Sequence, residues 1–382
     1  MQVLGIESSC DETAAAVVAE VDDVARPWQI RSSVVASQVE IHREWGGVVP
    51  ELASRQHLRD ICGVVEQALE EAGIAMAGRG SEGPRHTDPG LARAQSGPFQ
   101  PDSGRLGRLR RGIDAVAVTQ GPGLVGSLLV GLQFAKSLAA SIGKPLIPVH
   151  HLAGHIESLF LHNGALPLPA VVLVVSGGHT SLYLVPEPGI YTLIARTRDD
   201  AAGEAYDKVA KLLGQGYPGG PIIDRLAREG DDRAIAFPTT RITHRDRNAP
   251  GLAGRLDFSF SGIKTAVMRH VKSENRVFSP REIADICASF QRVVVDTLVE
   301  RLFEAASRFG AKSVGIAGGV SANSRLRKDA TARGNAMGLP VFLPTLALST
   351  DNAAMIAAAG LRRFRQGLTA GWDLNADPAL KL

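Results

Sequence analysis

Two histidines spaced for a shared metal ion stand in the stretch HHLAGHI, residues 150–156. His151 and His155 are four residues apart, so on a helix they lie on one face and their imidazoles can bind one ion. The nearest known pattern is the H-E-x-x-H of zinc peptidases, in which the Glu beside the first His activates water. Leu152 occupies that position here, and Glu157 lies about 200° around the helix from His155. The stretch therefore predicts a metal site without a peptidase's general base.

A third ligand has to come from elsewhere in the chain. Asp351 in the turn STDNAA is the candidate, because it stands between apolar runs at the start of a final Ala-rich helix. Two histidines and one carboxylate leave coordination positions open for water or substrate. We predict a metal site at His151, His155 and Asp351; the alternative is that the histidines are ordinary core or surface residues.

Three glycine-rich turns follow apolar strands, namely TQGPGLVGS, SGGHTS and AGGVSANS. Glycine lets backbone N–H groups approach an anion closely, and the N-terminus of a following helix favours negative charge. Their repetition in one chain favours a phosphate or nucleotide site. The chain has neither G-x-x-x-x-G-K-[ST] nor G-x-G-x-x-G, which argues against a P-loop and a dinucleotide-binding turn.

A further polar segment, RDDAAGEAYDKVAKLLG, carries several carboxylates and is followed closely by YPGGPIID. Its acids suit the positive end of a helix, which is the simpler interpretation. A Gly-Gly turn beside an aspartate can also meet a ribose, because a carboxylate accepts hydrogen bonds from both hydroxyls. The residues alone leave both interpretations open.

These candidates are positioned by a repeated arrangement of strands and tight turns. A short apolar strand at residues 3–6 enters the polar turn ESSCDET, and two more apolar runs follow, which predicts an antiparallel start to a sheet. The same strand, polar turn and strand return from residue 170 around SGGHT. Apolar runs predict further strands at 113–118, 146–149 and 313–316. Helical periodicity predicts helices at 50–72, 283–309 and 352–364. Three more helices are expected, two that follow the turns GPGLVGS and AGGVSAN and one that begins at HHLAGHI. We expect a duplicated architecture without a duplicated sequence.

The bulk composition is that of a soluble globular protein. With 382 residues the chain suits two lobes or domains, and 45% hydrophobic and 21% charged residues are ordinary values. The net charge of +3 permits a nucleic-acid partner without requiring one, and 5% aromatic residues argue against a run of base-stacking platforms. The 3 cysteines form no C-x-x-C pair, which favours reduced thiols. The N-terminus does not resemble a signal peptide. The apolar run at 124–142 contains Gln133 and Lys136, which favours a buried helix over a membrane span. We therefore expect a cytoplasmic protein.

Residues 78–111 interrupt the pattern. This stretch is rich in Gly, Pro and Arg, shows no apolar period, and carries seven arginines against three acidic residues. Such a composition predicts a disordered or loosely held insertion. A basic arm that touches an RNA backbone is the functional alternative.

A series of motifs resembles one enzyme family over nearly the whole chain. In order they are GIESSCDETAAAVV, HREWGGVVPELASRQH, VTQGPGLVGSLLVG, HHLAGHI, VVSGGHTSL, DDAAGEAYDKVAKLLG, YPGGP, FSFSGIKTAV, GGVSANSRLR and STDNAAM. The family is that of the bacterial tRNA N6-adenosine threonylcarbamoyltransferases (TsaD), once labelled glycoproteases. The resemblance implies an α/β actin-like, Hsp70-like ATPase (ASKHA) fold, with two ribonuclease-H-like lobes around a cleft. It also implies transfer of threonylcarbamoyl from threonylcarbamoyl-AMP to N6 of adenosine 37 in tRNAs that read codons beginning with A.

The resemblance also assigns site residues. The metal ligands match His151, His155 and Asp351, with Fe(2+) expected and Zn(2+) as the other possible ion. Positions that line the adenylate, lie near its ribose or contact the nucleotide match Val174, Val175, Ser176, Gly177, Gly178, Asp207, Gly220, Asp224 and Asn323. Asp11 and Glu12 lie on the first turn and are candidates for steering the acceptor amine. No catalytic base is identified.

The same resemblance suggests how the chain is organised and what it meets. We expect an N-terminal lobe at 1–149 that contains the insertion, a C-terminal lobe at 150–348, and a final helix and tail at 349–382 that return to the first lobe. Expected partners are tRNA, a smaller paralogous subunit (TsaB-like) and a P-loop ATPase subunit (TsaE-like), and the apolar segment 124–140 is either core or one such interface. The long insertion and Ala153, where relatives commonly have Glu, depart from the family pattern. A small-molecule O-carbamoyltransferase and a nucleotide-gated scaffold are the rival functions.

Overall fold

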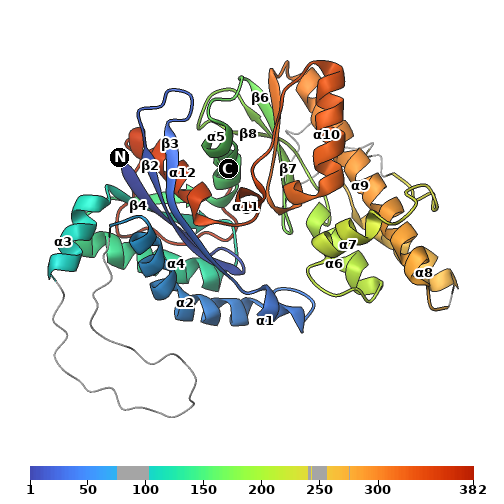
Figure 1. Cartoon of the computed structure of the whole chain (residues 1–382), viewed down its shortest axis with the longest axis horizontal. Helices are drawn as coiled ribbons and strands as arrows, with labels where there is room; N and C mark the ends of the chain where they lie inside the picture. Colours follow the sequence, from blue (N-terminus) through green and yellow to red (C-terminus); the bar gives the residue numbers. More distant parts are fainter. Residues whose placement is uncertain (75–102, 240–241, 243–255, 275) are drawn as a thin grey trace, which may run out of the picture.

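The computed structural model describes residues 1–74, 103–239, 242, 256–274 and 276–382, and contains two five-stranded sheets (Figure 1). The first sheet consists of β1 (Gln2–Glu7), β2 (Glu12–Glu20), β3 (Trp28–Ser37), β4 (Ala115–Gly121) and β5 (Leu146–His150). The second consists of β6 (Ala170–Val175), β7 (Thr180–Val185), β8 (Thr192–Arg196), β9 (Ser313–Ala317) and β10 (Val341–Phe342). Strand orders are β3-β2-β1-β4-β5 and β10-β9-β6-β7-β8.

The two sheets share one topology. In each, the first three strands form an antiparallel meander, and the last two strands run parallel to the first. The predicted duplication of architecture is therefore confirmed. Strands β1, β4 and β5, and likewise β6 and β9, end at the carboxyl edge of their sheet, which is where parallel sheets carry ligand-binding loops.

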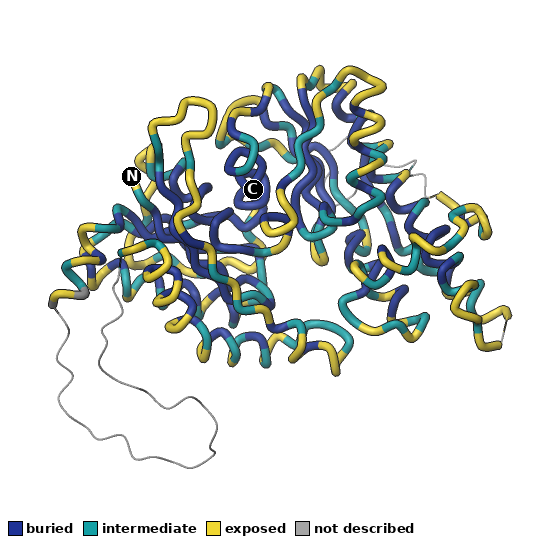
Figure 2. The backbone as a smooth tube through the Cα atoms, viewed as in Figure 1, coloured by how far each residue is buried: buried dark blue, intermediate teal, exposed yellow. Residues whose placement is uncertain are grey.

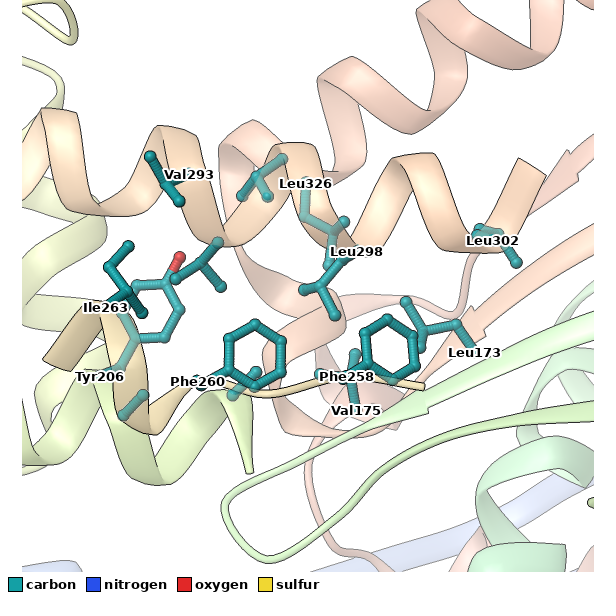
Figure 3. Close-up of a cluster of buried hydrophobic side chains, with 14 of the residues drawn as sticks. Leu173, Val175, Tyr206, Phe258, Phe260, Ile263, Val293, Leu298, Leu302 and Leu326 are labelled. Atoms are coloured by element: carbon teal, nitrogen blue, oxygen red, sulfur yellow. The ribbon is translucent and has the colours of Figure 1, made fainter. Parts of the chain in front are cut away.

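Helices cover both faces of each sheet. On one face of the first sheet pack α2 (Pro50–Glu71), α3 (Ser103–Gly112) and α4 (Val125–Ile142), and on the other α12 (Ala353–Arg365). One face of the second sheet lies in a core shared with α6 (Ala202–Leu212), α8 (Ser261–Glu274), α9 (Pro280–Arg308) and α10 (Ser324–Met337); α7 (Gly219–Ala227) packs on α6 and α9, and α5 (His151–Asn163) covers the other face. Figure 3 shows part of that core, with Leu173 and Val175 facing Leu298 of α9. Short helices are α1 (Val39–Arg43), η1 (Gly319–Ala322) and α11 (Leu346–Ser349).

Helices α5 and α12 form the layer between the two sheets, and Figure 2 shows the buried backbone that results. They approach closely at Gly154, where an added Cβ would lie 2.9 Å from Cδ1 of Ile356. A side chain at this position would have to displace the side chain of Ile356. The central part of HHLAGHI thus holds α5 against the helix that follows Asp351.

The helices and strands predicted from periodicity are present within a few residues of the predicted bounds. Strands β8 and β10, helices α7 and α8, and the short helices α1, η1 and α11 were not predicted. Helix α4 is long and apolar enough to cross a membrane by composition, but it packs against β4 and α2, as predicted for a core helix. One prediction was wrong. Residues 103–111 of the supposedly disordered insertion belong to α3, because Leu106 and Leu109 reach the first lobe's core, and Leu109 is only 6% exposed. Residues 78–102 of that prediction lie outside the described residues.

Candidate active site

The structure brings the two histidines and the distant aspartate together. Imidazole nitrogens of His151 and His155 and a carboxylate oxygen of Asp351 all lie within 4.8 Å of one another. Oδ1 of Asp351 is 3.1 Å from Nε2 of His155 and 3.6 Å from Nε2 of His151. His155 is fully buried, and neither of its ring nitrogens has a hydrogen bond with acceptable geometry among the described residues. Two histidines on one turn of α5 and a carboxylate from the chain before α12 thus form a group that could hold a metal ion.

His151 is oriented from behind by the first strand. Its Nδ1 lies 3.2 Å from Oε2 of the fully buried Glu7 at the end of β1, and Thr119 of β4 donates to the same oxygen at 2.6 Å. A carboxylate on Nδ1 fixes that nitrogen as the donor and leaves Nε2 directed at Asp351. Sequence reasoning missed Glu7, although its place after an apolar strand in GIESS was a usable signal.

Charges in this group stabilise one another. Burial lowers the pKa of His151, but the carboxylates of Asp351 and Glu7 outweigh burial and raise it to about 9. Burial opposes ionisation of Asp351, yet the two histidines hold its pKa below the ordinary value. His179 lies in the SGGHT turn and is a second residue that sequence reasoning missed. Burial and the charges of His151 and His155 lower its pKa to about 4, which favours the neutral imidazole beside the metal-ligand group.

The SGG turn after β6 is open on its exposed side. Val174 and Val175 are buried strand residues, whereas Gly177 and Gly178 are exposed, and a Cβ added at either glycine would meet nothing within 4 Å. Ser176 accepts the backbone N–H of His179 at 3.2 Å and so closes the turn. This leaves exposed glycine backbone beside the metal-ligand group.

A second polar group joins three helices of the second lobe. Oδ1 of Asp224 in α7 accepts hydrogen bonds from Gln291 at 3.2 Å and from the Ser324 hydroxyl at 2.8 Å. The Gln291 amide oxygen in turn accepts from Asn323 at 2.8 Å, and Asn323 caps α10. The structure therefore links two predicted residues, Asp224 and Asn323, through Gln291, which was not predicted. A Cβ at Gly220 in the first turn of α7 would meet nothing within 4 Å, so backbone is accessible there as well.

Carboxylates of the two lobes influence one another electrostatically; we call Asp11, Glu12 and Asp207 the acidic cluster. Burial raises the pKa of Asp207 to about 6; a hydrogen bond of 2.7 Å from the Gly219 N–H opposes that shift, and the Asp11 charge adds to it. Burial, and then Asp11 and Asp351, raise the pKa of Glu12 well above its ordinary value. Burial and the Asp11 and Asp207 charges likewise raise the pKa of Tyr217, which sequence reasoning missed. The two lobes thus share one electrostatic environment, which also reaches the metal-ligand group.

Comparisons with known protein sequences all give the same family. The family model for TsaD, tRNA N6-adenosine threonylcarbamoyltransferase, matches residues 29–78 and 109–358. The tRNA N6-adenosine threonylcarbamoyltransferase of Anaeromyxobacter dehalogenans (strain 2CP-C) is 50% identical over 382 residues, covering 100% of this chain and 99% of that one. The protein of the same name from Moorella thermoacetica is 46% identical over 380 residues, covering 100% and 97%.

The chain belongs to the TsaD family. It transfers a threonylcarbamoyl group to N6 of an adenosine in tRNA. A solved structure of full-length HypF in a phosphate- and nucleotide-bound form has a TM-score of 0.54 at 12% identity, covering 97% of this chain and 47% of that one. That likeness concerns the fold alone, and it agrees with the actin-like fold that the sequence motifs imply.

One buried ion pair fixes the two ligand-bearing segments of this TsaD chain relative to each other. Arg362 of α12 donates to both oxygens of Glu157 of α5, each at 2.7 Å, and the Tyr191 hydroxyl donates to the same carboxylate. The guanidinium also lies over the rings of Trp28 and Phe160, at 4.7 and 5.0 Å from their centroids. Glu157 is fully buried and binds Arg362 and not the metal-ligand group, which agrees with its predicted position about 200° around the helix from His155.

We expect Arg362→Gln to destabilise the fold by about 3–5 kcal/mol, because it leaves the buried Glu157 carboxylate without its cation. Arg365→Gln on the same helix is the matched control. Arg365 is 62% exposed and pairs with Glu20, so its loss is expected to cost below about 1 kcal/mol. Chemical denaturation of both variants measures the difference. Equal costs would show that the Glu157–Arg362 pair does not fasten α5 to α12.

Asp207 gives a prediction with a defined pH dependence. Its folded pKa of about 6 exceeds the unfolded value of 3.8, so the folded chain binds the proton more tightly and loses stability as pH rises from about 4 to 6. Asp207→Asn keeps an oxygen for the Gly219 N–H and removes this loss. We expect the variant to be more stable by about 1–3 kcal/mol above pH 6, with the gain vanishing near pH 4. Denaturant titrations at several pH values test this, with exposed Asp22→Asn as control; a gain that is independent of pH would contradict it.

Proposed function

We propose that the donor is threonylcarbamoyl-AMP and the acceptor is adenosine 37 of tRNAs that read codons beginning with A. One observation carries this proposal. The group of His151, His155 and Asp351 lies beside the accessible glycine backbone of the SGG turn, where strands of the two sheets end. A metal beside backbone N–H groups suits a substrate with a carbonyl and a phosphate in one anhydride. Neither rival function has a specific observation in its favour, and full-length relatives at 50% identity argue against both.

We propose His151, His155 and Asp351 as the ligands of one divalent ion, with Fe(2+) expected and Zn(2+) possible. The buried ring nitrogens of His155 support this, because neither makes a hydrogen bond of acceptable geometry among the described residues, and Nε2 faces Oδ1 of Asp351 at 3.1 Å. The carboxylate of Glu7 on the far nitrogen of His151 is the usual support for a metal-bound histidine. When bound, such an ion supplies a Lewis acid that stabilises negative charge on the acyl oxygen.

The adenylate is proposed to lie along Val174–Gly178 and to extend to α7 and α10. Glycine N–H groups of the SGG turn would donate to the phosphate, which is the leaving group. Asp207 and Asp224 would accept hydrogen bonds from ribose hydroxyls, the backbone at Gly220 would pass close to the nucleotide, and Asn323 would contact it. Two hydrogen bonds, from Gln291 to Asp224 and from Asn323 to Gln291, support this because they fix Asp224 and Asn323 relative to each other.

The proposed step replaces a carbon–oxygen bond of the donor with a carbon–nitrogen bond. N6 of adenosine attacks the carbamoyl carbon, the bond from that carbon to the phosphate oxygen breaks, AMP leaves with the electron pair, and the proton lost by N6 is released to the solvent. The donor is already activated, so the residues mainly need to position the reactants, which can supply ~7–11 kcal/mol. Asp11 and Glu12 are proposed to accept or share hydrogen bonds of the acceptor amine.

We also propose the lobe boundaries at 1–149, 150–348 and 349–382, a cytoplasmic location, and assembly with a TsaB-like and a TsaE-like subunit. Contacts of α12 with β1 and β2 support the return of the last segment to the first lobe. The exposed Val125 and Leu129 of α4 leave part of that helix accessible to a partner.

Mass analysis of tRNA nucleosides, after depletion and rescue of the chain, tests the proposal. We expect N6-threonylcarbamoyladenosine to disappear and to return with the wild-type chain. A purified chain with its partner subunits should also convert synthetic threonylcarbamoyl-AMP and unmodified tRNA to product and AMP. No turnover with the supplied adenylate would overturn the proposed donor.

A further inference from the structure

Trp45 is an exposed aromatic side chain that the proposed chemistry does not use. It belongs to the motif HREWGGVVPELASRQH, and 61% of it is accessible to solvent. Its indole offers a large, rigid aromatic face that a ligand ring can cover.

The loop that carries Trp45 is braced from within the first lobe. His42 is fully buried; its Nδ1 lies 3.3 Å from the backbone N–H of Val49, and its Nε2 lies 3.3 Å from Oε1 of Gln38. The carbonyl of His42 accepts the N–H of Trp45 at 3.1 Å. The buried imidazole of His42 therefore joins the two ends of the loop, at Gln38 and Val49, and the indole of Trp45 lies exposed on the loop between them.

The same bracing connects Trp45 with the acidic cluster. The backbone N–H of Gln38 donates to the carbonyl of Asp11 at 2.9 Å, so the loop and the first turn are fastened together. On the other side, a Cβ added at Gly46 would lie 3.4 Å from Nζ of Lys211 in α6. Lys211 follows Asp207 by four residues and shares its helix face. The loop of Trp45 is thus hydrogen-bonded to the turn of Asp11 through Gln38, and its Gly46 lies against Lys211, one helical turn from Asp207.

We propose that Trp45 is a stacking platform for an unpaired base of the tRNA, next to the acceptor adenosine. For N6 to reach the carbonyl, its base has to leave the stack of its loop, and the neighbouring base then loses a stacking partner. RNA-binding proteins replace such partners with aromatic side chains, and Lys211 offers a cation for the adjoining backbone. One platform is compatible with the low aromatic content.

RNA is favoured over a protein as the occupant because the loop of Trp45 is joined to the turn of Asp11 and lies against α6. The acceptor strand has to pass the acidic cluster for the reaction to occur, whereas a protein partner has no such requirement. This inference rests on tRNA being the substrate. It adds a residue that sets the affinity for the RNA without taking part in the transfer.

The test is steady-state transfer from synthetic threonylcarbamoyl-AMP to unmodified tRNA, by the chain with its partner subunits. We expect Trp45→Ala to raise the KM for tRNA about tenfold or more with kcat little changed, from the usual value of base–aromatic stacking. Trp45→Phe should restore most of the affinity. Trp372→Ala is the matched control, since Trp372 is 56% exposed in the C-terminal tail.

Binding of labelled tRNA to the purified chain separates the possible occupants. Weaker binding by Trp45→Ala, restored by Trp45→Phe, supports the platform. If Trp45→Ala leaves both the KM for tRNA and the RNA affinity unchanged, the proposal is wrong. It is also wrong if Trp45→Ala leaves the RNA affinity unchanged but weakens assembly with a protein subunit. In both cases wild-type transfer continues, whereas failure of the wild-type chain to modify tRNA would count against the proposed function.

Discussion

His155→Ala is expected to remove bound metal and tRNA modification together while the fold stays intact. The side chain is fully buried and its Nε2 lies 3.1 Å from Oδ1 of Asp351, so truncation removes a contact within the metal-ligand group. Loss of a Lewis acid worth several kcal/mol should reduce transfer at least about 100-fold. Metal content after reconstitution, circular dichroism and the tRNA nucleoside assay measure the three parts of this prediction.

His162→Ala is the matched control for that variant. His162 lies in the last turn of the same helix, is half-exposed, and belongs to neither the metal-ligand group nor the acidic cluster. It should keep its metal and its activity. If His155→Ala retains full tRNA modification, the metal mechanism is wrong; if it loses activity but keeps its metal, His155 acts in some other way.

The sequence was sufficient to find the residues that bring their own local pattern. A spacing of four in HHLAGHI and a polar turn before an Ala-rich helix indicated His151, His155 and Asp351, and the structure places them within 4.8 Å. Glycine after apolar strands indicated the SGG turn in the same way. Strong apolar periodicity also gave the long helices and the repeated meander, because burial on one face is written directly in the sequence.

Residues that depend on register between distant segments could not be found in this way. Glu7 meets His151 across 144 positions, and Gln291 meets Asp224 across 67. Each bond exists only because two strands or helices pack at one particular register, which local patterns do not encode. The error at residues 103–111 has the opposite cause: Leu106 and Leu109 stand at helical spacing, but arginines and glycines around them hid it. Short elements such as α7 and β8 lacked enough residues for a period.

Gly5→Ala is expected to lower stability although it adds only one carbon atom. A Cβ on Gly5 of β1 would lie 2.3 Å from the carbonyl oxygen of Ala353 and 2.6 Å from the backbone nitrogen of Ala357. These are backbone atoms of α12, which cannot rotate away, so the helix has to shift. Overpacking of this kind costs about 1–3 kcal/mol or more. Asp351 precedes α12 by two residues, so we expect weaker metal binding along with lower stability.

Gly63→Ala separates the lack of space from the loss of glycine itself. Gly63 lies in α2, where an added Cβ meets nothing within 4 Å, and alanine in a helix interior should stabilise the chain by about 0.5–1 kcal/mol. Denaturation and metal titration of both variants decide the matter. If Gly5→Ala lowers stability but leaves the metal affinity unchanged, then α12 moves without Asp351 and the contact of β1 with α12 serves the core alone. A parallel loss of both would show that the first strand sets the position of the third metal ligand.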